Sequence, residues 1–271
     1  MKLLISSDLS ARSDVALQRA MALTDRLNAE LLVLHVIDSE LPPSLQSRQK
    51  DRARDVLHQA LRAGGKQRQS KVLVRSGHPY LTIGEVAEEH DVDLVILGSY
   101  RKEILKDTFI GTTAERVMRT SRRPVLMVNH ASTEPYQRPM VAVDFSSISA
   151  LVLQTAKRFG FTTSTELSVI YAVSPEGRAN ESEKDARRQE AQHKLSELLT
   201  AEDIAVRPNH LIAEEGEACP VIRDWARRTE ADLLIMGTSG MGGVRRMFIG
   251  SVAGSLLREL ECDMLAVPAP D

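Results

Sequence analysis

The chain has few aromatic residues and no long apolar run. Aromatic side chains make up 4% of its 271 residues, and Trp225 is the single tryptophan. Because single-stranded nucleic acid stacks its bases on aromatic rings, this scarcity argues against such a ligand. The formal net charge of -2 provides no basic field that would gather a phosphate backbone or an anionic lipid surface. We therefore expect no nucleic-acid partner.

Cysteine is equally scarce. Cys219 and Cys262 are too few for a disulfide framework and lack the spacing of metal ligands. The first apolar run, Leu3 to Ile5, is too short for the core of a signal peptide, and no segment reaches the length that crosses a membrane. The histidines do not pair at metal-ligand spacings. We expect no metal site built from protein ligands alone, no membrane association and a cytoplasmic location.

What the chain does contain is an internal repeat. The apolar run that ends at Asp8 has a counterpart that ends at Asp144, 136 positions later. Further along, residues 93–98 match residues 232–237 at an offset of 139, and Gly111-Thr112 matches Gly250-Ser251 at the same offset. Ordered matches with one small insertion indicate a tandem duplication.

The join between the copies is polar. Residues 130–139 contain two prolines and show neither a helical nor a strand period. This composition predicts two domains, residues 1–133 and residues 134–271.

Each copy is interpreted as five short apolar strands separated by amphipathic helices. In the first copy the apolar runs lie near residues 2–6, 31–37, 71–75, 93–97 and 124–128. Runs that are apolar on both faces are typical of parallel strands covered by two helix layers. Alternation of strands with helices predicts right-handed crossovers and a doubly wound α/β sheet. Such sheets bind ligands beyond the carboxyl ends of their strands, where the winding reverses.

A glycine-rich segment of the second copy is the candidate site. Gly237 ends the fourth strand, Gly240 follows, and Gly250-Ser251 opens a predicted helix, which gives the spacing G-x2-G-x9-G-S. Glycine lets the backbone approach a ligand without a Cβ, and free N–H groups at a helix start favour an anion. Arg245 and Arg246 lie in the intervening loop, where their charge suits phosphate. The alternative is that these glycines only form a turn and a helix cap.

An acidic residue, Asp144, ends the first strand of the second copy. At the reversal of strand order it would lie next to the fourth strand, within reach of a ribose or of a metal-bound phosphate. Its alternative role is to cap the helix that follows. The two roles can coexist.

These motifs, in this order, resemble the universal stress proteins, and the resemblance covers nearly the whole chain twice. It rests on Asp144-Phe145-Ser146, on Gly216 after the third strand, and on the glycine spacing. It implies two tandem Rossmann-like domains of the adenine nucleotide alpha hydrolase type. Each would be a five-stranded parallel sheet of order 3-2-1-4-5 with helices on both faces.

In one branch of the family the resemblance also implies ATP binding, with Mg²⁺ accompanying the nucleotide. The nucleotide positions would be Asp144, Ala172, Met236, Gly237, Ser239, Gly240, Gly250, Ser251 and Val252, to which the loop adds Arg245. The resemblance further implies self-association through the fifth strands, either as a pseudo-dimer of the two halves or as a homodimer.

The first copy departs from this pattern. Arg101 stands where the middle glycine of the loop is expected, and its side chain would fill the turn or the phosphate space. Glu103 and Asp107 add negative charge that would repel a triphosphate. We therefore predict a degenerate nucleotide loop in the first domain, with Arg101 as a mimic of ligand charge that holds an empty site shut.

Three functions are compatible with these features. The leading hypothesis is a stress-response regulatory protein that binds ATP in its second domain and signals through association with an unknown protein partner. A slow ATPase or phosphotransferase ranks lower because no general base is evident, so no catalytic residue is predicted. A nucleotide-free scaffold is the third.

Other features have plain structural interpretations. His78 is interpreted as a loop histidine beside a turn rather than as a catalytic group. Cys219 opens a helix whose dipole would lower its pKa, although a small apolar filler is the simpler interpretation. The charged start of a predicted helix from about residue 179 to 200 is interpreted as a solvated face.

Overall fold

The computed structural model describes residues 1–66, 69–99, 112–164, 166–175, 180–238 and 250–270. Within it the chain divides into two compact units, Met1–Glu134 and Pro135–Asp271. Several residues of the predicted loops lie outside the described residues, namely Arg101, Glu103, Asp107, Gly111, Ser239, Gly240, Arg245 and Arg246.

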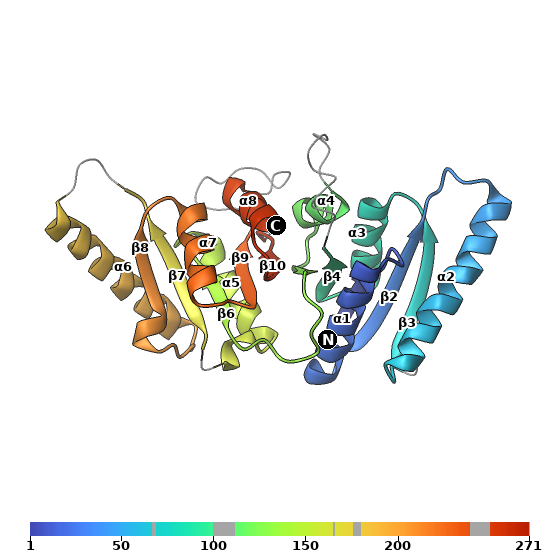
Figure 1. Ribbon diagram of the computed structural model, residues 1–271, viewed down its shortest axis with the longest axis horizontal. Helices are drawn as coiled ribbons and strands as arrows, with labels where there is room; N and C mark the ends of the chain where they lie inside the picture. Colours follow the sequence, from blue (N-terminus) through green and yellow to red (C-terminus); the bar gives the residue numbers. More distant parts are fainter. Residues whose placement is uncertain (67–68, 100–111, 165, 176–179, 239–249, 271) are drawn as a thin grey trace. The chain divides into compact units, whose positions relative to one another are not determined.

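The first unit alternates strands with helices (Figure 1). Its strands are β1 (Lys2–Ser6), β2 (Glu30–Ile37), β3 (Ser70–Ser76), β4 (Leu94–Gly98) and β5 (Val125–Val128). Its helices are α1 (Ala11–Leu27), α2 (Pro43–Ala63), α3 (Pro79–Glu89) and α4 (Thr113–Thr120). The strands pair in parallel in the order β3-β2-β1-β4-β5.

The second unit repeats this order of elements. Its strands are β6 (Pro139–Ala142), β7 (Ser168–Val173), β8 (Leu211–Glu215), β9 (Leu233–Gly237) and β10 (Asp263–Val267). Its helices are α5 (Ser147–Arg158), η2 (Phe161–Thr163), α6 (Glu181–Ala201), η3 (Pro208–His210), α7 (Ala218–Arg228) and α8 (Ser251–Glu259). These strands are also parallel, in the order β8-β7-β6-β9-β10. The Rossmann-like fold predicted for both copies is confirmed.

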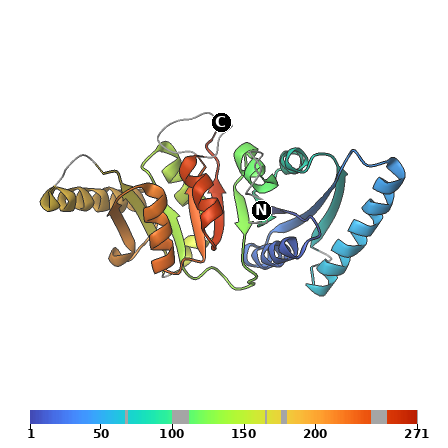
Figure 2. The same cartoon turned by 45° about the horizontal axis from the view of Figure 1, so that its top comes forward.

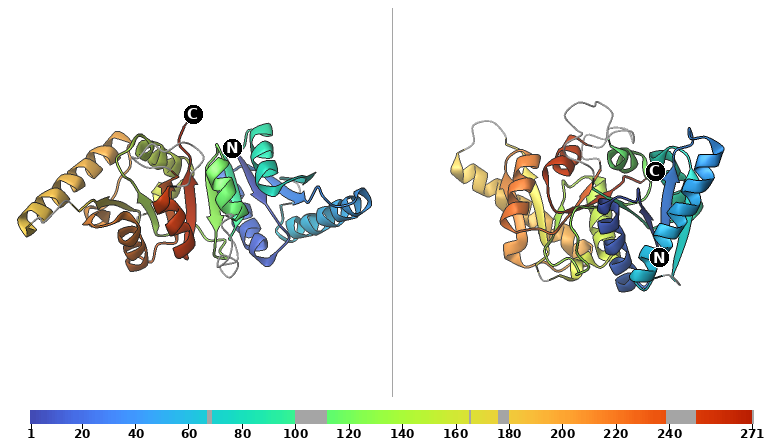
Figure 3. Two further views of the ribbon diagram at one scale, coloured as in Figure 1. Left: turned by 90° about the horizontal axis from the view of Figure 1, so that it is seen from above. Right: turned by 45° about the vertical axis from the view of Figure 1, so that its right-hand side comes forward.

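Helices cover both faces of each sheet. In the first unit α3 and α4 pack against one another on one face, while α1 and α2 lie on the other (Figure 2). In the second unit α7 and α8 form the corresponding pair (Figure 3). Right-handed crossovers require this division, because the chain crosses the sheet in one direction from β1 to β3 and in the opposite direction from β3 to β5, and likewise from β6 to β8 and from β8 to β10. The winding therefore reverses between β1 and β4, and between β6 and β9.

The apolar runs form the core because helices bury them from both sides. In β1 the side chains of Leu3, Leu4 and Ile5 are fully buried, as are Leu233, Leu234 and Ile235 in β9. The predicted strands of the first copy match the observed ones to within one residue at each end. Among the residues that the structure describes, no helix is both long and apolar enough to cross a membrane.

Candidate functional site

The first strand ends in the same turn in both units. Leu9 and Phe145, which follow Asp8 and Asp144, adopt left-handed backbone conformations with φ of 62° and 57°. For a residue with a Cβ this conformation costs about 1–2 kcal/mol. In each turn a backbone N–H, from Ser10 or from Ser146, donates to the aspartate Oδ1 at 3.0 Å. The turn thus folds the carboxylate back toward the start of the next helix.

Asp144 is held by two serines of the helix that follows. Its Oδ1 accepts hydrogen bonds from the Ser146 hydroxyl and, at 3.1 Å, from the Ser149 hydroxyl. The residue is half-buried, and Ser146 is the N-cap of α5. Asp144 therefore supports the start of α5 through these serines. This is close to the alternative role considered from the sequence, in which Asp144 caps the following helix.

The end of β7 presents backbone groups beyond the end of β6. The Val143 N–H donates to the Ile170 carbonyl at 3.0 Å, and the Gly216 N–H donates to the Val173 carbonyl at 2.9 Å. Because successive residues of a strand direct their backbone groups to opposite sides, the N–H and C=O of Ala172 face the β6 side. The paired register of β6 ends at Ala142, opposite Ile170. Ala172 thus offers a donor and an acceptor at an open edge.

An aromatic pair lies beside Ala172. The rings of Phe145 and Tyr171 have centroids 4.5 Å apart at an interplanar angle of 53°. The pair joins the turn after β6 to the end of β7. Tyr171 was not predicted to be near the site, although it directly precedes Ala172 in the sequence.

The start of α8 is tied to the end of β9. The Thr238 N–H donates to the Val267 carbonyl at 2.9 Å, and the Gly250 N–H donates to the Thr238 carbonyl at 2.7 Å. The Gly250 N–H is therefore already used, contrary to the expectation that it is free for an anion. Among the residues that the structure describes, no side chain caps α8. The donors at this helix start are the backbone groups of its first turn, which begins at Ser251.

Met236 and Gly237 lie in β9 itself. Met236 is buried, so a ligand at the strand end would meet its backbone rather than its side chain. Gly237 pairs with Val267 at the last position of the β9–β10 register. Val252, in the first turn of α8, is partly exposed.

The N-terminus of α4, the corresponding helix of the first unit, is capped by side chains of its own first turn. Thr112 is the N-cap of α4, and its Oγ1 accepts from the Glu115 N–H at 3.2 Å. In return, Glu115 Oε2 accepts from the Thr112 N–H at 2.9 Å. This capping box places a carboxylate at the helix start. At the offset of 139, Ser251 and Gly254 stand at these positions, so the second unit lacks the carboxylate.

Glu115 was not identified from the sequence, although the spacing Thr-x-x-Glu is a known signal of a capping box.

Gly98, the first glycine of the loop pattern in the first unit, has a packing role that the sequence analysis did not consider. A Cβ at Gly98 would lie 2.8 Å from the Arg12 carbonyl oxygen and 3.1 Å from the Ser13 nitrogen. Close packing of α1 against the end of β4 therefore requires this glycine.

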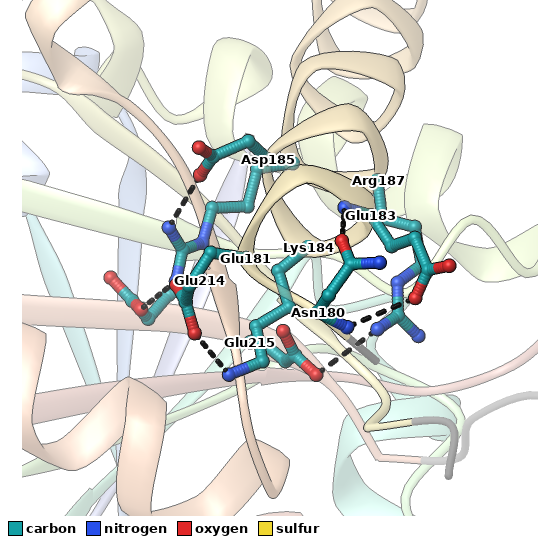
Figure 4. Close-up of polar contacts among 9 residues, drawn as sticks. Asn180, Glu181, Glu183, Lys184, Asp185, Arg187, Glu214 and Glu215 are labelled. Atoms are coloured by element: carbon teal, nitrogen blue, oxygen red, sulfur yellow. Dashed lines mark hydrogen bonds and ion pairs between the residues drawn. The ribbon is translucent and has the colours of Figure 1, made fainter. Parts of the chain in front are cut away.

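Charged residues at the start of α6 join the edge of the second sheet (Figure 4). Arg187 Nη2 lies 3.3 Å from Glu215 Oε1, and Arg188 Nη2 lies 3.8 Å from Glu214 Oε1. Glu214 is the register partner of Ala172. The interpretation of this helix start as a simple solvated face is therefore wrong for Arg187 and Arg188, which anchor α6 beside the strand end.

The sequence model of the universal stress protein family matches residues 1–129 and again residues 135–268. The chain belongs to this family. Universal stress protein MJ0577 of Methanocaldococcus jannaschii is 26% identical over 159 residues, which cover 49% of this chain and 96% of that protein. Universal stress protein E of Escherichia coli K12 is 26% identical over 192 residues, which cover 65% of this chain and 60% of that protein.

A solved structure of a universal stress protein from Archaeoglobus fulgidus has the same fold. It aligns with a TM-score of 0.75 over 98% of both chains, at 24% sequence identity. Together with the two matches of the family model, this shows that two universal stress protein domains follow one another in this chain.

The structure also describes the surroundings of both cysteines and of His78 in this universal stress protein. Burial raises the pKa of Cys219, so the alternative in which the helix dipole lowers that pKa is wrong. Cys262 is buried in the second unit, and its pKa is raised to about 12 by that burial. His78 is exposed, and its carbonyl accepts the Thr82 N–H at the start of α3.

Proposed function

We propose that the second unit binds ATP at the carboxyl ends of β6, β7 and β9. In this arrangement the Ala172 backbone meets the adenine edge, Asp144 meets the ribose, and the start of α8 at Gly250, Ser251 and Val252 meets the phosphates. The backbone of Met236 and Gly237 would lie beneath the nucleotide. Ser239, Gly240 and Arg245, which belong to the glycine-rich loop of the sequence, would complete the phosphate site.

The observation that carries this proposal is the contrast between the two helix starts. The N-terminus of a helix favours negative charge because its N–H groups and dipole point toward the ligand. In α4 that charge is supplied by Glu115, whereas no side chain of the described residues caps α8. The second unit therefore retains a place for a phosphate that the first unit fills with its own carboxylate.

Mg²⁺ would accompany the triphosphate and be held mainly by phosphate oxygens. Mg²⁺ in nucleotide sites keeps several waters and uses only one or two carboxylates. Among the described residues, no group of three or more His, Cys, Asp or Glu could hold a metal ion by itself. Asp144 would be within reach either of the ribose or of a metal-bound phosphate.

The proposed biological role is regulatory. ATP occupancy would change the association of this cytoplasmic stress-response protein with a protein partner or with a second copy through the fifth strands. Light scattering of the purified chain with and without ATP measures the second effect directly. An unchanged molar mass under both conditions would restrict the role to a partner protein.

The first experiment identifies the ligand itself. Purified protein is denatured, and the released small molecules are identified by mass spectrometry. Calorimetric titration with ATP then compares the natural chain with Gly250→Asp, and with Gly111→Asp as the matched change in the first unit. We expect Gly250→Asp to abolish ATP binding and Gly111→Asp to preserve it.

Two results would replace the proposal. ATP turnover that Gly250→Asp abolishes would favour the slow ATPase or phosphotransferase. The absence of any released or titratable adenine nucleotide would favour the nucleotide-free scaffold.

A further inference from the structure

The first half of α6 buries none of its side chains. The first buried residue of this 21-residue helix is Ala191, followed by Leu195 and Leu199. Residues 181–190, here called the arm of α6, contain a single apolar side chain, that of Ala186, and it is exposed. Because most helical stability in proteins comes from packing of an apolar face, the arm must be held by other forces.

Local contacts favour the helical form of the arm but are not enough for it. The N-cap residue Asn180 forms a capping box with Glu183, in which Asn180 Oδ1 accepts from the Glu183 N–H at 2.9 Å. One turn along, Lys184 Nζ lies 2.7 Å from Glu181 Oε1. Isolated helices shorter than about 12–15 residues are marginal in water even with such contacts. The arm therefore needs a contact with the rest of the unit to stay ordered.

Two ion pairs provide that contact, at the edge strand β8 (Figure 4). Arg187 Nη2 lies 3.3 Å from Glu215 Oε1, and Arg188 Nη2 lies 3.8 Å from Glu214 Oε1. Among the residues that the structure describes, no other hydrogen bond or ion pair joins the arm to another element. The contact of the arm with the sheet thus depends on charge.

Both ion pairs are weak. The Nε atoms of Arg187 and Arg188 are buried, and neither has a hydrogen-bond partner among the described residues. A buried donor without an acceptor opposes folding. The side chains of Arg188 and Glu214 are 35% and 36% exposed, so solvent screens their attraction. Added salt weakens it further, because the Debye length falls from about 10 Å at 0.1 M to about 3 Å at 1 M.

The first unit has a helix of the same design without these charges. The first buried residue of α2 is also its eleventh, Ala53. Near the start of α2, Gln46 Nε2 donates to the Leu41 carbonyl at 2.7 Å, and Gln46 Oε1 accepts from the Ser76 hydroxyl at 2.9 Å. Salt does not screen these neutral contacts. The first half of α2, residues 43–52, is therefore an internal control.

We propose that the arm of α6 is a switch that responds to ionic strength. At low salt concentration the arm is helical and in contact with β8. At high salt concentration the ion pairs of Arg187 and Arg188 weaken, and the arm separates from β8 and loses its helical structure. The second half of α6 stays in place, because Ala191, Leu195 and Leu199 remain buried.

Opening of the arm has a consequence for the strand ends of the second unit. In the first unit, Gln49 lines a cavity of about 380 Å³ together with Asp8 and His35. Gln49 is the seventh residue of α2, and Arg187 is the seventh residue of α6. By this correspondence the arm forms one wall at the carboxyl ends of β6 and β7, and its opening gives access there. This consequence alone rests on the ATP binding proposed above.

Hydrogen exchange of the full chain at low and high KCl concentration tests the switch. Two partly exposed ion pairs together shift an opening equilibrium by about fivefold. We therefore expect the amides of residues 184–190 to exchange about fivefold faster at about 1 M than at about 0.1 M KCl. Residues 191–201 and residues 43–52 are expected to be unchanged. Equal exchange of residues 184–190 at both concentrations would overturn the proposal.

A double-mutant cycle separates the ion pair from a general effect of salt. At low salt we expect Arg187→Gln and Glu215→Gln each to speed exchange of the arm by about threefold, and the double variant to be no faster than either. At high salt all three are expected to match the natural chain. Lys50→Gln, in the first half of α2, is the matched control and should leave the arm unchanged. Effects of the two variants that multiply at low salt would overturn the proposal.

Stopped-flow kinetics of ATP binding test the consequence for the site. A gate changes rates rather than the equilibrium, so we expect Arg187→Gln to raise the association and dissociation rate constants by the same factor, about threefold. Unchanged rate constants with ATP still bound would overturn the gating role. If the natural chain binds no ATP, the proposed function fails, and hydrogen exchange still decides whether the arm is a switch.

Discussion

The two halves of this universal stress protein have the same backbone fold. They differ in the charge of the side chains at corresponding positions. Asp8 and Asp144 each receive a hydrogen bond from the residue two positions on, at 3.0 Å in both cases. At the last helix, however, α4 carries the Thr112–Glu115 capping box, whereas α8 has no side-chain cap within the described part of the chain. Duplication has kept the buried framework and changed the chemistry at the strand ends.

The charged and polar contacts at the end of the third strand of each unit, β3 and β8, differ as well. Gln49 and Arg187 are both the seventh residue of a 21-residue helix, α2 or α6. Gln49 lines the cavity of the first unit, whereas Arg187 pairs with Glu215 at the end of β8. In the first unit the corresponding strand end is held by a neutral hydrogen bond of 2.9 Å, from the Ser76 hydroxyl to Gln46 Oε1. The comparison shows that an ion pair at the end of β8 and a neutral hydrogen bond at the end of β3 occupy corresponding places in the two units.

The largest expected effect comes from transferring the capping box to the second unit. Gly254→Glu places a carboxylate three positions after Ser251, as Glu115 is placed after Thr112. We expect ATP affinity to fall by about a hundredfold, or about 2.7 kcal/mol, because the new charge occupies the phosphate position. Calorimetric titration measures the change. Gly254→Gln is the control, and an equal loss in both variants would show that size rather than charge is responsible.

A buried polar contact is the next test, since it exists only in the second unit. The Tyr136 hydroxyl donates to Asp263 Oδ2 at 2.6 Å, and Pro124 stands at the position of Asp263 in the first unit. Tyr136→Phe is expected to lower the free energy of unfolding of the second unit by about 1.5–3 kcal/mol, the usual value for a hydrogen bond to a charged group. Urea denaturation followed by circular dichroism measures it. Tyr80→Phe in the first unit should change stability by less than about 0.5 kcal/mol, and a similar loss there would contradict the assignment.

Gly98 tests whether a shared glycine serves packing. Gly98→Ala brings a Cβ to 2.8 Å from the Arg12 carbonyl, so we expect a loss of about 1–3 kcal/mol in unfolding free energy from overpacking. Gly84, inside α3, has no heavy atom within 4 Å of its would-be Cβ. Gly84→Ala should therefore stabilise the chain by about 0.8 kcal/mol through helix propensity. Equal effects at the two sites would show that contact with α1 is unimportant.

The smallest effect concerns the two thiols of the second unit. Burial raises the pKa of both, and that of Cys262 to about 12. Because the thiolate is the reactive form, we expect slow labelling of Cys219 by a disulfide reagent at neutral pH and none of Cys262 before unfolding. A pKa raised on folding stabilises the folded chain below the ordinary value of 9.0 and loses that contribution as the pH rises toward 12. Native labelling of Cys262 as fast as that of Cys219 would contradict its burial.

The sequence predicted the fold well because the signals of the fold are local and repeated. Apolar runs such as Leu3–Ile5 and Leu233–Ile235 mark strands that are covered on both faces, and the duplication shows each element twice. The start of α8 at Gly250-Ser251 was also predicted correctly from the sequence. The nucleotide site in the second unit remains a prediction that the described residues support through Asp144 and Ala172.

What the sequence alone determined is therefore the tandem α/β architecture, its family and the asymmetry between its halves, because hydrophobic period and glycine spacing are properties of the chain. Tertiary structure decided which groups meet. Gly98 serves packing against α1, Arg187 reaches Glu215, and Phe145 packs against Tyr171, since parallel strands bring residues distant in sequence to one edge. The pocket beside His35 and Asp8 belongs to this second class, because a cavity exists only where separate strands end together.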